Sequence, residues 1–323
     1  MGKVSHPNIK SFTNESMWKI TTWLEEEIFN SNSGEIVKFI VPNPDEKDNN
    51  DFDSFPKIDT KPRNYHSWKA WSDLAELLYC RMLTPKLLDG GEVLLRYQKL
   101  DLSDSFHRIQ DEDKKEKYGA KSKFSAIKKN EEPAFLFAFR RALQQVKIAK
   151  RSVILDLGIN SGDEFEMIQK LVKSDRWHQM QLIGIDHSPS AIKEAKARFP
   201  DESVTLHCHD INHLDELTLP KADLLLSIGT LQSPGIDFKP LFMSLIQNHL
   251  AENGAVILGF PNCRWIDGEM IYGAKAPNYN FPEMSLVIKD IYFCKKYLQQ
   301  HKFRVTITGK DYLFLTATRI GKG

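Results

Sequence analysis

The sequence predicts an α/β protein whose C-terminal half folds as a doubly wound, mostly parallel sheet of seven strands. From Ser152 to Arg319, short apolar runs alternate with helical patterns, which is typical of βαβ units and of a sheet covered on both faces. The last two runs are separated only by Gly309, Lys310 and Asp311, a connection too short for a parallel crossover. These two runs are therefore predicted to pair as an antiparallel hairpin at the end of the sheet.

The elements of this sheet follow one another in chain order. The seven expected strands are 152–157, 181–185, 204–208, 222–227, 255–259, 303–308 and 312–318. The helices expected between them are 163–172, 190–198, 238–249 and 288–300.

Residues 1–110 are predicted to form a mixed, helix-rich N-terminal region with an accessory or substrate-binding role. Asn14 can cap a helix that runs through Glu27, because its side chain can accept a backbone hydrogen bond from the first turn. The polar, Pro-punctuated stretch 41–63 is expected to be a loop. A second helix with one buried face follows, and then a strand at 92–100. The residues of that buried face are Trp68, Trp71, Ala75, Leu78 and Met82.

Residues 111–151 form a basic segment that leads into the C-terminal domain at 152–323. Between residues 114 and 151 there are 12 Lys and Arg residues against 3 Asp and Glu residues. Pro133 opens a helix in the second half of this segment. The expected apolar stripe of the helix is Phe135, Leu136, Phe139, Leu143 and Val146. Its Lys and Arg face is either solvated or a surface for an anionic ligand, such as RNA phosphates or an acidic substrate.

The composition is that of a globular protein with a substantial core. The 323 residues are 41% hydrophobic and 27% charged, and 44 Lys and Arg residues against 43 Asp and Glu residues leave a net charge of +1. No global field therefore favours nucleic acid or an anionic membrane. No apolar run approaches the roughly 20 residues of a membrane span, and no signal peptide is apparent, so we expect no membrane partner. Four cysteines lie far apart without a CxxC pair, so we expect a cytoplasmic protein with reduced thiols.

A Gly-rich turn joins the first strand of the sheet to its first helix. Asp156 precedes Gly158, Asn160 and Gly162, and the helix begins at Asp163. Such a turn lets backbone N–H groups and a helix N-terminus approach a ligand closely. Glycine is needed where a Cβ would block that approach or forbid a positive φ, and Asn is the non-glycine residue that best tolerates a left-handed backbone. The same residues could also merely shape a tight turn.

Polar residues follow at the ends of the next three strands. Asp186, with His187 beside it, ends the second strand, where a carboxylate can accept hydrogen bonds from a ribose diol. Asp210 follows the third strand, where it can accept from an exocyclic adenine amine while Ile211 packs on the ring. Ser227 ends the fourth strand. These positions are the C-terminal strand ends at which open α/β sheets bind ligands.

This order of motifs resembles the class I S-adenosylmethionine-dependent methyltransferase family over residues 152–319, about half of the chain. The family's first motif is an acid followed by three alternating glycines, and Asn160 stands here at the middle position. The resemblance implies a Rossmann-like fold, S-adenosyl-L-methionine as the cofactor, and a Gly-rich turn along its methionine part. It further implies that Asp186 holds the ribose, and that Asp210 and Ile211 hold the adenine. The cofactor-binding candidates are Asp156, Gly158, Asn160, Gly162, Asp186, His187, Asp210, Ile211 and Ser227.

The motifs by which this architecture binds other ligands do not match the sequence. A nicotinamide-dependent dehydrogenase requires G-x-G-x-x-G, which the turn from Gly158 to Gly162 breaks, and no Gly-Lys-[Ser/Thr] marks a P-loop. We expect no metal, because His207 and His209 face one side of a strand and Cys208 the other. The fourth strand is followed by Ser-Ile-Gly-Thr, not by the Asn/Asp/Ser-Pro-Pro-Tyr/Phe motif of the family's base-directed amino methyltransferases. Exocyclic amines of DNA and a protein glutamine are therefore disfavoured as acceptors.

The segment after the fifth strand is the candidate acceptor site, and the alternative is that it is a simple lid or packing segment. It is a polar and aromatic insertion of about 25 residues, and loops of that length are usually functional or disordered. The substrate-binding candidates are Asn262, Arg264, Tyr272 and Tyr279. No catalytic residue can be named, because methyl transfer mainly requires positioning and the exclusion of water.

Three hypotheses follow. The main one is an active methyltransferase with a small-molecule acceptor, whose pocket the N-terminal region helps to form. The second is a tRNA or rRNA methyltransferase that uses the basic segment 114–151, for which RNA affinity would fall steeply with salt. The third is a non-catalytic protein that keeps the fold, for which the cofactor would bind without any transfer.

Overall fold

The computed structural model describes residues 9–46, 65–104, 119, 122, 127–274 and 282–321. The chain forms two compact units. Unit 1 comprises Met1–Arg108 and Trp265–Ile271, and unit 2 comprises Ile109–Arg264 and Tyr272–Gly323. The chain therefore enters unit 1 a second time, through a short segment inserted between two parts of unit 2. The functional boundaries predicted at residues 110 and 151 stay predictions.

A small, mostly antiparallel sheet forms the centre of unit 1. Its strands are β1 (Lys10–Ser11), β2 (Ile36–Pro42), β3 (Cys80–Met82), β4 (Lys86–Leu88) and β5 (Glu92–Lys99). They lie in the order β1-β2-β5-β3, and β4 pairs with β5. The long pair β2 and β5 is antiparallel, with Phe39 opposite Leu95.

Two helices, α1 (Met17–Asn30) and α2 (Trp68–Leu77), contribute side chains to the core of unit 1. The Phe39 ring lies 5.0 Å from that of Tyr97 and 5.9 Å from that of Trp71. The Tyr97 hydroxyl donates to the Trp71 carbonyl at 2.6 Å, so this buried phenol is satisfied within the core.

The local structure of unit 1 differs from the sequence prediction at three places. The cap of α1 is Ser16, whose side chain accepts from the backbone N–H of Lys19, and not Asn14. The second helix ends at Leu77, because Tyr79 takes a positive φ of 53° and the next residues join β5 as β3. Strand β2 was not predicted, and part of it lies in the stretch expected to be a loop. Its short apolar run gains its strand identity from pairing with β5, a non-local contact.

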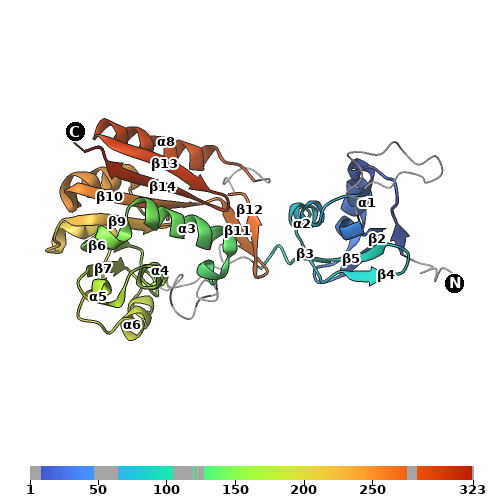
Figure 1. Ribbon diagram of the computed structural model, residues 1–323, viewed down its shortest axis with the longest axis horizontal. Coiled ribbons are helices and arrows are strands. Elements are labelled where there is room, and N and C mark those ends of the chain that lie inside the picture. Colours follow the sequence, from blue (N-terminus) through green and yellow to red (C-terminus); the bar gives the residue numbers. More distant parts are fainter. Residues whose placement is uncertain are drawn as a thin grey trace. The chain divides into compact units, whose positions relative to one another are not determined.

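The prediction of a mostly parallel, seven-stranded sheet with an antiparallel C-terminal hairpin is confirmed in unit 2 (Figure 1). The strands are β6 (Val153–Leu157), β7 (Gln181–Asp186), β8 (Val204–Cys208), β9 (Ala222–Ile228), β10 (Leu250–Pro261), β13 (Phe303–Gly309) and β14 (Tyr312–Arg319). Their order is β13-β14-β10-β9-β6-β7-β8, and β14 is antiparallel to both of its neighbours. The chain reverses direction across the sheet between β6 and β9, and ligands bind at such a switch point.

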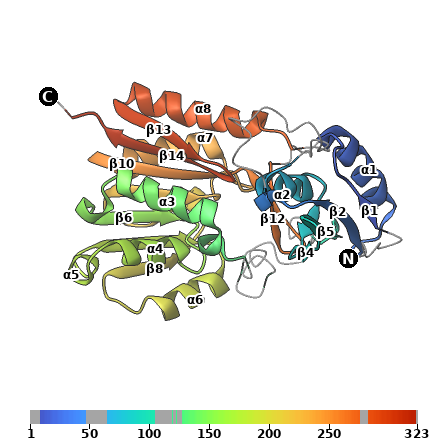
Figure 2. The same ribbon diagram turned by 45° about the vertical axis from the view of Figure 1, so that its right-hand side comes forward.

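Helices cover both faces of this sheet (Figures 1 and 2). Those of unit 2 are α3 (Pro133–Gln145), α4 (Asp163–Leu171), α5 (Ser174–Trp177), α6 (Pro189–Arg198), α7 (Phe238–Ser244) and α8 (Ser285–Gln300). The apolar stripe predicted for α3 packs on β14, where Phe135 and Phe139 each lie 5.5 Å from the Phe314 ring. On the opposite face, α7 and α8 share a core with β10, to which Phe242, Leu258 and Leu298 contribute.

The insertion after β10, which the sequence predicted as a loop, contains a β-hairpin made of β11 (Cys263–Ile266) and β12 (Glu269–Tyr272). Asp267 and Gly268 take positive φ values of 48° and 76° at its turn, as a two-residue hairpin loop requires. The hairpin tip belongs to unit 1, where the Arg81 guanidinium donates to the Glu269 carboxylate and to the Asp267 carbonyl. The backbone N–H of Asp101 donates to the Asp267 side chain at 3.3 Å.

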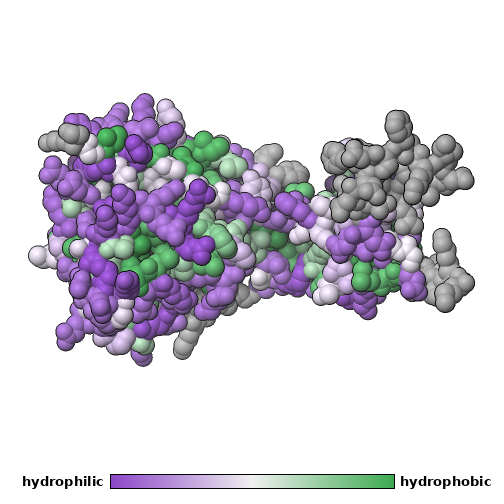
Figure 3. All heavy atoms as spheres, viewed as in Figure 1, coloured by the Kyte–Doolittle hydropathy of each residue, from purple (hydrophilic) through white to green (hydrophobic). Residues whose placement is uncertain are grey.

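Hydrophilic side chains cover most of the visible face of unit 2, with a few apolar patches between them (Figure 3). Among the residues that the structure describes, no helix is long and apolar enough to cross a membrane.

Candidate functional site

The Gly-rich turn after β6 has the left-handed geometry that its sequence predicts. Gly158, Asn160 and Gly162 take φ values of 79°, 47° and 96°. The Asn160 side chain accepts from the backbone N–H of Ser161 at 2.8 Å, which stabilises this residue in a conformation that is otherwise costly outside glycine. A Cβ at Gly158 would lie 1.9 Å from Oγ1 of Thr230, so this position requires glycine for space as well as for φ.

Asp186 joins the turn to the end of β7. Its carboxylate accepts from the backbone N–H of Asn160 at 3.0 Å and from that of Ser188 at 2.9 Å. Nδ1 of His187 lies 3.5 Å from the same carboxylate. The structure therefore brings Asn160, Asp186 and His187 together at the ends of β6 and β7. An ionised carboxylate has about four acceptor positions, so the two backbone bonds leave room for a ligand.

The other predicted cofactor residues have individual structural roles. Asp210 is exposed and caps the turn Ile211–Glu216, accepting from the backbone N–H of Asn212 at 2.9 Å. Ile211 is buried in the core beneath the sheet, together with Leu214. Ser227 is buried at the end of β9 and donates to the Leu157 carbonyl at 3.3 Å, which ties β9 to β6.

Asp156 is the most unusual of the predicted residues. It is 1% exposed, and neither carboxylate oxygen has a hydrogen-bond partner among the described residues. Burial, and next the neighbouring Glu164 carboxyl, raise the pKa of Asp156 well above its usual value. Buried carboxyl groups are normally hydrogen-bonded, so this one calls for an explanation.

Two charged side chains that no sequence motif indicated lie near Asp156. Glu164, in the first turn of α4, is 3% exposed, and its carboxylate lies 3.3 Å from Nζ of Lys129. Burial raises the pKa of Glu164, and Lys129 opposes that shift. Burial lowers the pKa of Lys129, but Glu164, Tyr312 and Asp163 together outweigh burial and hold that pKa above its usual value. Two buried carboxyl groups thus share one ammonium group.

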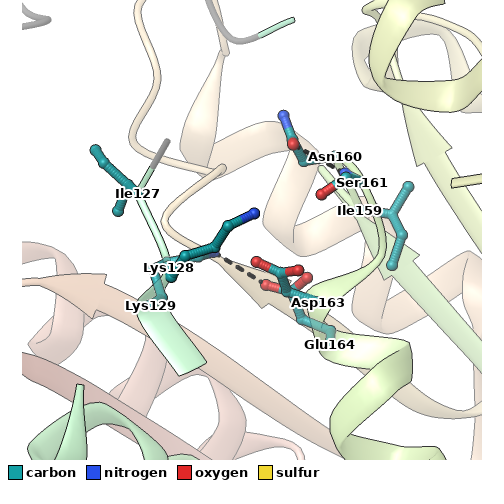
Figure 4. A pocket seen from close by; sticks show the side chains of 8 residues that line it. All are labelled: Ile127, Lys128, Lys129, Ile159, Asn160, Ser161, Asp163 and Glu164. Atoms are coloured by element: carbon teal, nitrogen blue, oxygen red, sulfur yellow. Dashed lines mark hydrogen bonds and ion pairs between the residues drawn. The ribbon is translucent and has the colours of Figure 1, made fainter. Parts of the chain in front are cut away.

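A pocket opens above this cluster, between the Gly-rich turn and the chain that precedes α3 (Figure 4). Lys128 and Lys129 extend toward the side on which Asp163 and Glu164 lie, and Asn160 forms part of the opposite wall (Figure 4). The lining residues are Ile127, Lys128, Lys129, Ile159, Asn160, Ser161, Asp163 and Glu164. Lys129 therefore does not belong to a solvated basic face, because it is buried beside the pocket.

The predicted acceptor residues are placed only in part. Asn262 is buried, and its carbonyl accepts from the backbone N–H of Gly273, so the two ends of the hairpin insertion meet. The Tyr272 hydroxyl lies 3.6 Å from the sulfur of Met284. Arg264 stands one residue before the segment that enters unit 1. Tyr279 lies outside the described residues.

The exposed side of α3 faces a groove of about 460 Å³ beside the β13–β14 turn. The Arg140 guanidinium lies 4.6 Å from the centre of the Phe137 ring, and the ring is 62% exposed. The lining residues are Ala134, Phe137, Ala138, Arg140, Arg141, Gln144, Thr308, Gly309 and Lys310. This set contains three cationic side chains and no acid.

Comparisons with known proteins address unit 2. A family described as a methyltransferase domain matches residues 148–304. No curated protein matches the chain.

Among solved structures, the chain is similar to the N-methyltransferase NodS from Bradyrhizobium japonicum WM9 in complex with S-adenosyl-L-homocysteine. The identity is 15%, the TM-score 0.41, and the match covers 60% of this chain and 90% of that one. It is also similar to a precorrin-6y C5,15-methyltransferase from Geobacter metallireducens GS-15, at 13% identity and a TM-score of 0.39, over 56% and 88% of the two chains. The family match and the strand order of unit 2 agree with the motifs of the Gly-rich turn. Residues 148–304 of this chain are therefore similar to a methyltransferase domain, and the motifs of the Gly-rich turn lie within that match.

Proposed function

We propose that this protein transfers a methyl group from S-adenosylmethionine to a small-molecule acceptor. The unpartnered Asp156 carboxylate is the observation that carries this proposal. With Glu164 and Lys129 it forms a buried cluster that has one positive charge for two carboxyl groups. A buried carboxyl group without a partner is costly, and a cationic ligand would favour its ionised form, so the cluster fits a ligand that brings a positive charge. The donor carries both an ammonium and a sulfonium group.

The residues at the strand ends fit the rest of this donor. Asp186 keeps free acceptor positions for a ribose diol at the edge where β6 and β7 meet. One oxygen of Asp210 caps its own turn, and the side chain is exposed, so it can accept from an adenine amine. Ile211 would support the ring from the core side. Lys128 is exposed on the pocket wall and can pair with the carboxylate of the methionine part.

The chemistry asks little of the protein beyond position. The bound donor supplies an electrophilic methyl group. The chain orients the donor by the Gly-rich turn and Asp186, holds the acceptor in line, and excludes water. Electrostatic interactions with the buried cluster of Asp156, Glu164 and Lys129 are strong, because few water molecules screen them.

Titration calorimetry with S-adenosylmethionine, and in parallel with NADH, tests the proposal. We expect micromolar binding of S-adenosylmethionine alone, and a loss of at least tenfold in affinity for Asp156→Asn, which keeps the shape and removes the charge. Equal binding of NADH would contradict the proposal. Binding without transfer to any of a broad set of small acceptors and RNAs would favour a non-catalytic role.

RNA is a second candidate acceptor, which the groove beside α3 favours. Three cations can contact phosphates there, and the exposed Phe137 ring offers a face on which a base can stack. The groove also includes Lys310, whose carbonyl accepts from the Asn262 side chain at 3.1 Å, so it adjoins the predicted acceptor segment. RNA affinity that falls steeply between 50 and 200 mM salt would support this candidate.

A further inference from the structure

Asn262 and Asp311 lie opposite each other at the end of the β10–β14 pair. The register of this pair runs from Ala255 opposite Thr318 to Pro261 opposite Tyr312, and Asn262 and Asp311 are the next residues. The Asn262 backbone N–H donates to the Asp311 carbonyl at 2.8 Å, which extends the ladder by this step. Residues opposite each other on an antiparallel ladder place their side chains on the same face.

Both side chains carry a buried acceptor that is not hydrogen-bonded. Asn262 is 2% exposed and Asp311 is 4% exposed. Oδ1 of Asn262 and Oδ1 of Asp311 have no hydrogen-bond partner in the described part of the chain. The Asn262 amide nitrogen is satisfied, because it donates to the Lys310 carbonyl. Oδ1 of Asp311 lies 3.6 Å from Nζ of Lys310, whose side chain is 59% exposed.

The pair sits at the edge of the sheet where the donor is proposed to bind. Asn262 directly follows β10. This strand pairs in parallel with β9, and β9 is one of the two strands between which the switch point lies. The backbone N–H of Gly229, just after β9, donates to the Gly259 carbonyl at 2.8 Å. The orphaned oxygens are therefore close in the fold to the strand ends that hold the cofactor candidates.

Two opposed acceptors call for a group with two donors. A neutral primary amine has two N–H donors and one lone pair, so it can satisfy both oxygens and still present its lone pair. An alcohol or a thiol has a single donor and would leave one buried oxygen unpaired, which is costly.

We propose that Asn262 and Asp311 bind the amino group of the methyl acceptor, so that the acceptor is a small primary amine. This inference rests on the proposed function. The amine reaches the site after its ammonium form has lost one proton to water. Its lone pair forms the new N–C bond while the C–S bond of the sulfonium donor breaks, which leaves a methylated ammonium and a thioether.

Matched pairs of small amines and alcohols test the proposal by thermal unfolding in the presence of S-adenosylhomocysteine. The probes are phenethylamine against 2-phenylethanol, and putrescine against 1,4-butanediol. For the wild type, we expect at least one of the two amines to raise the melting temperature of unit 2 by about 2 °C or more at 10 mM, and its alcohol to have no effect. Methyl transfer from a labelled donor, measured on the same probes, should follow the same preference.

Asp311→Asn is the informative variant. Its new amide can donate to Oδ1 of Asn262, so the resting protein should melt about 3 °C or more higher, while the amine effect disappears. Thr316→Val is the matched control in β14, the strand that follows Asp311, because the Thr316 hydroxyl is buried but donates to Gln145 at 2.8 Å. This control should melt lower and keep the amine effect.

The outcomes separate this inference from the proposed function. A wild type that does not bind S-adenosylmethionine overturns the proposed function. A wild type that binds it, but is stabilised by no probe amine or equally by amine and alcohol, overturns only the amine site. A lower melting temperature for Asp311→Asn would show that the pair is structural and would overturn it as well.

Discussion

Nζ of Lys129 lies 3.3 Å from the Glu164 carboxylate, and the two side chains are only 12% and 3% exposed. Lys129 precedes α3, whereas Glu164 lies in the first turn of α4 after the Gly-rich turn. This ion pair therefore links the basic segment to the cofactor site. Lys129 also supplies the positive charge of the cluster that it forms with Glu164 and Asp156.

Replacing Lys129 with Met should destabilise unit 2 by about 3 kcal/mol, because it leaves two buried carboxyl groups without a cation. Urea unfolding followed by circular dichroism measures this. Lys128→Met is the matched control. Its free energy of unfolding should stay within about 0.5 kcal/mol of that of the wild type, since Lys128 is exposed. Adding Glu164→Gln to Lys129→Met should recover part of the loss. A Lys129→Met protein as stable as the control would contradict a structural role for the pair.

Asp156 should make stability depend on pH in a direction opposite to that of most carboxylates. Its pKa is raised in the folded protein, so the folded state holds a proton that the unfolded state has released. Stability should therefore fall as the pH rises above the usual Asp value of about 3.9 toward the raised pKa. Asp156→Asn removes this dependence. Urea unfolding of the two proteins should show that, from pH 5 to pH 8, the free energy of unfolding of the variant rises relative to that of the wild type. A difference in this free energy that is the same at both pH values would refute the raised pKa.

Asp186→Ala should weaken S-adenosylmethionine binding by about 2 kcal/mol or more, which is about 30-fold in Kd, because the ribose would lose a charged acceptor. Calorimetric titration measures the change. Asp201→Ala is a suitable control, since Asp201 precedes β8 and so lies at the opposite edge of the sheet. Unchanged affinity in Asp186→Ala, with retained secondary structure, would remove Asp186 from the site.

The double variant Arg140→Ala, Arg141→Ala separates the two candidate acceptors. Both side chains are exposed, so the fold and the turnover of a small acceptor should be unchanged. If RNA binds in the groove, its affinity should fall and the slope of log K against log salt should shrink by about 1.4, as two phosphate contacts are lost. Filter binding at several salt concentrations measures both. An unchanged slope would argue against RNA in this groove.

Arg81→Ala tests the anchoring of the hairpin tip in unit 1. The guanidinium contacts Glu269, the Asp267 carbonyl and Gln98, and it is partly exposed, so the expected loss is only about 1 kcal/mol. Hydrogen exchange of residues 265–271 should become faster. Lys86→Ala changes an exposed residue of the same unit and should leave the exchange rate of residues 265–271 unaltered. Equal exchange in the two variants would show that other contacts hold the hairpin.

The sheet of unit 2 was predictable because its strands and helices carry local signals. These signals are the hydrophobic period, Pro133 at the start of α3, and the short connection Gly309, Lys310 and Asp311 before β14. The positive φ at Asn160 was predictable for the same reason, since the backbone preference belongs to that residue. Unit 1 was less predictable. β2 becomes a strand by pairing with β5, and the hairpin tip finds its partners in residues such as Arg81, far away in sequence.

Local patterns in the chain were enough to predict the fold class of the C-terminal half, the order of its strands and helices, and the acids at the strand ends, because these follow from period, spacing and turn chemistry. Which polar groups are buried, and which of them find a partner, became visible only in the folded chain. It removed Lys129 from the solvated face and placed it against Glu164, and it left Asp156, Asn262 and Asp311 with buried oxygens that are not hydrogen-bonded. Burial and hydrogen bonding depend on residues brought together from distant parts of the chain, so a pattern of neighbouring residues cannot encode them.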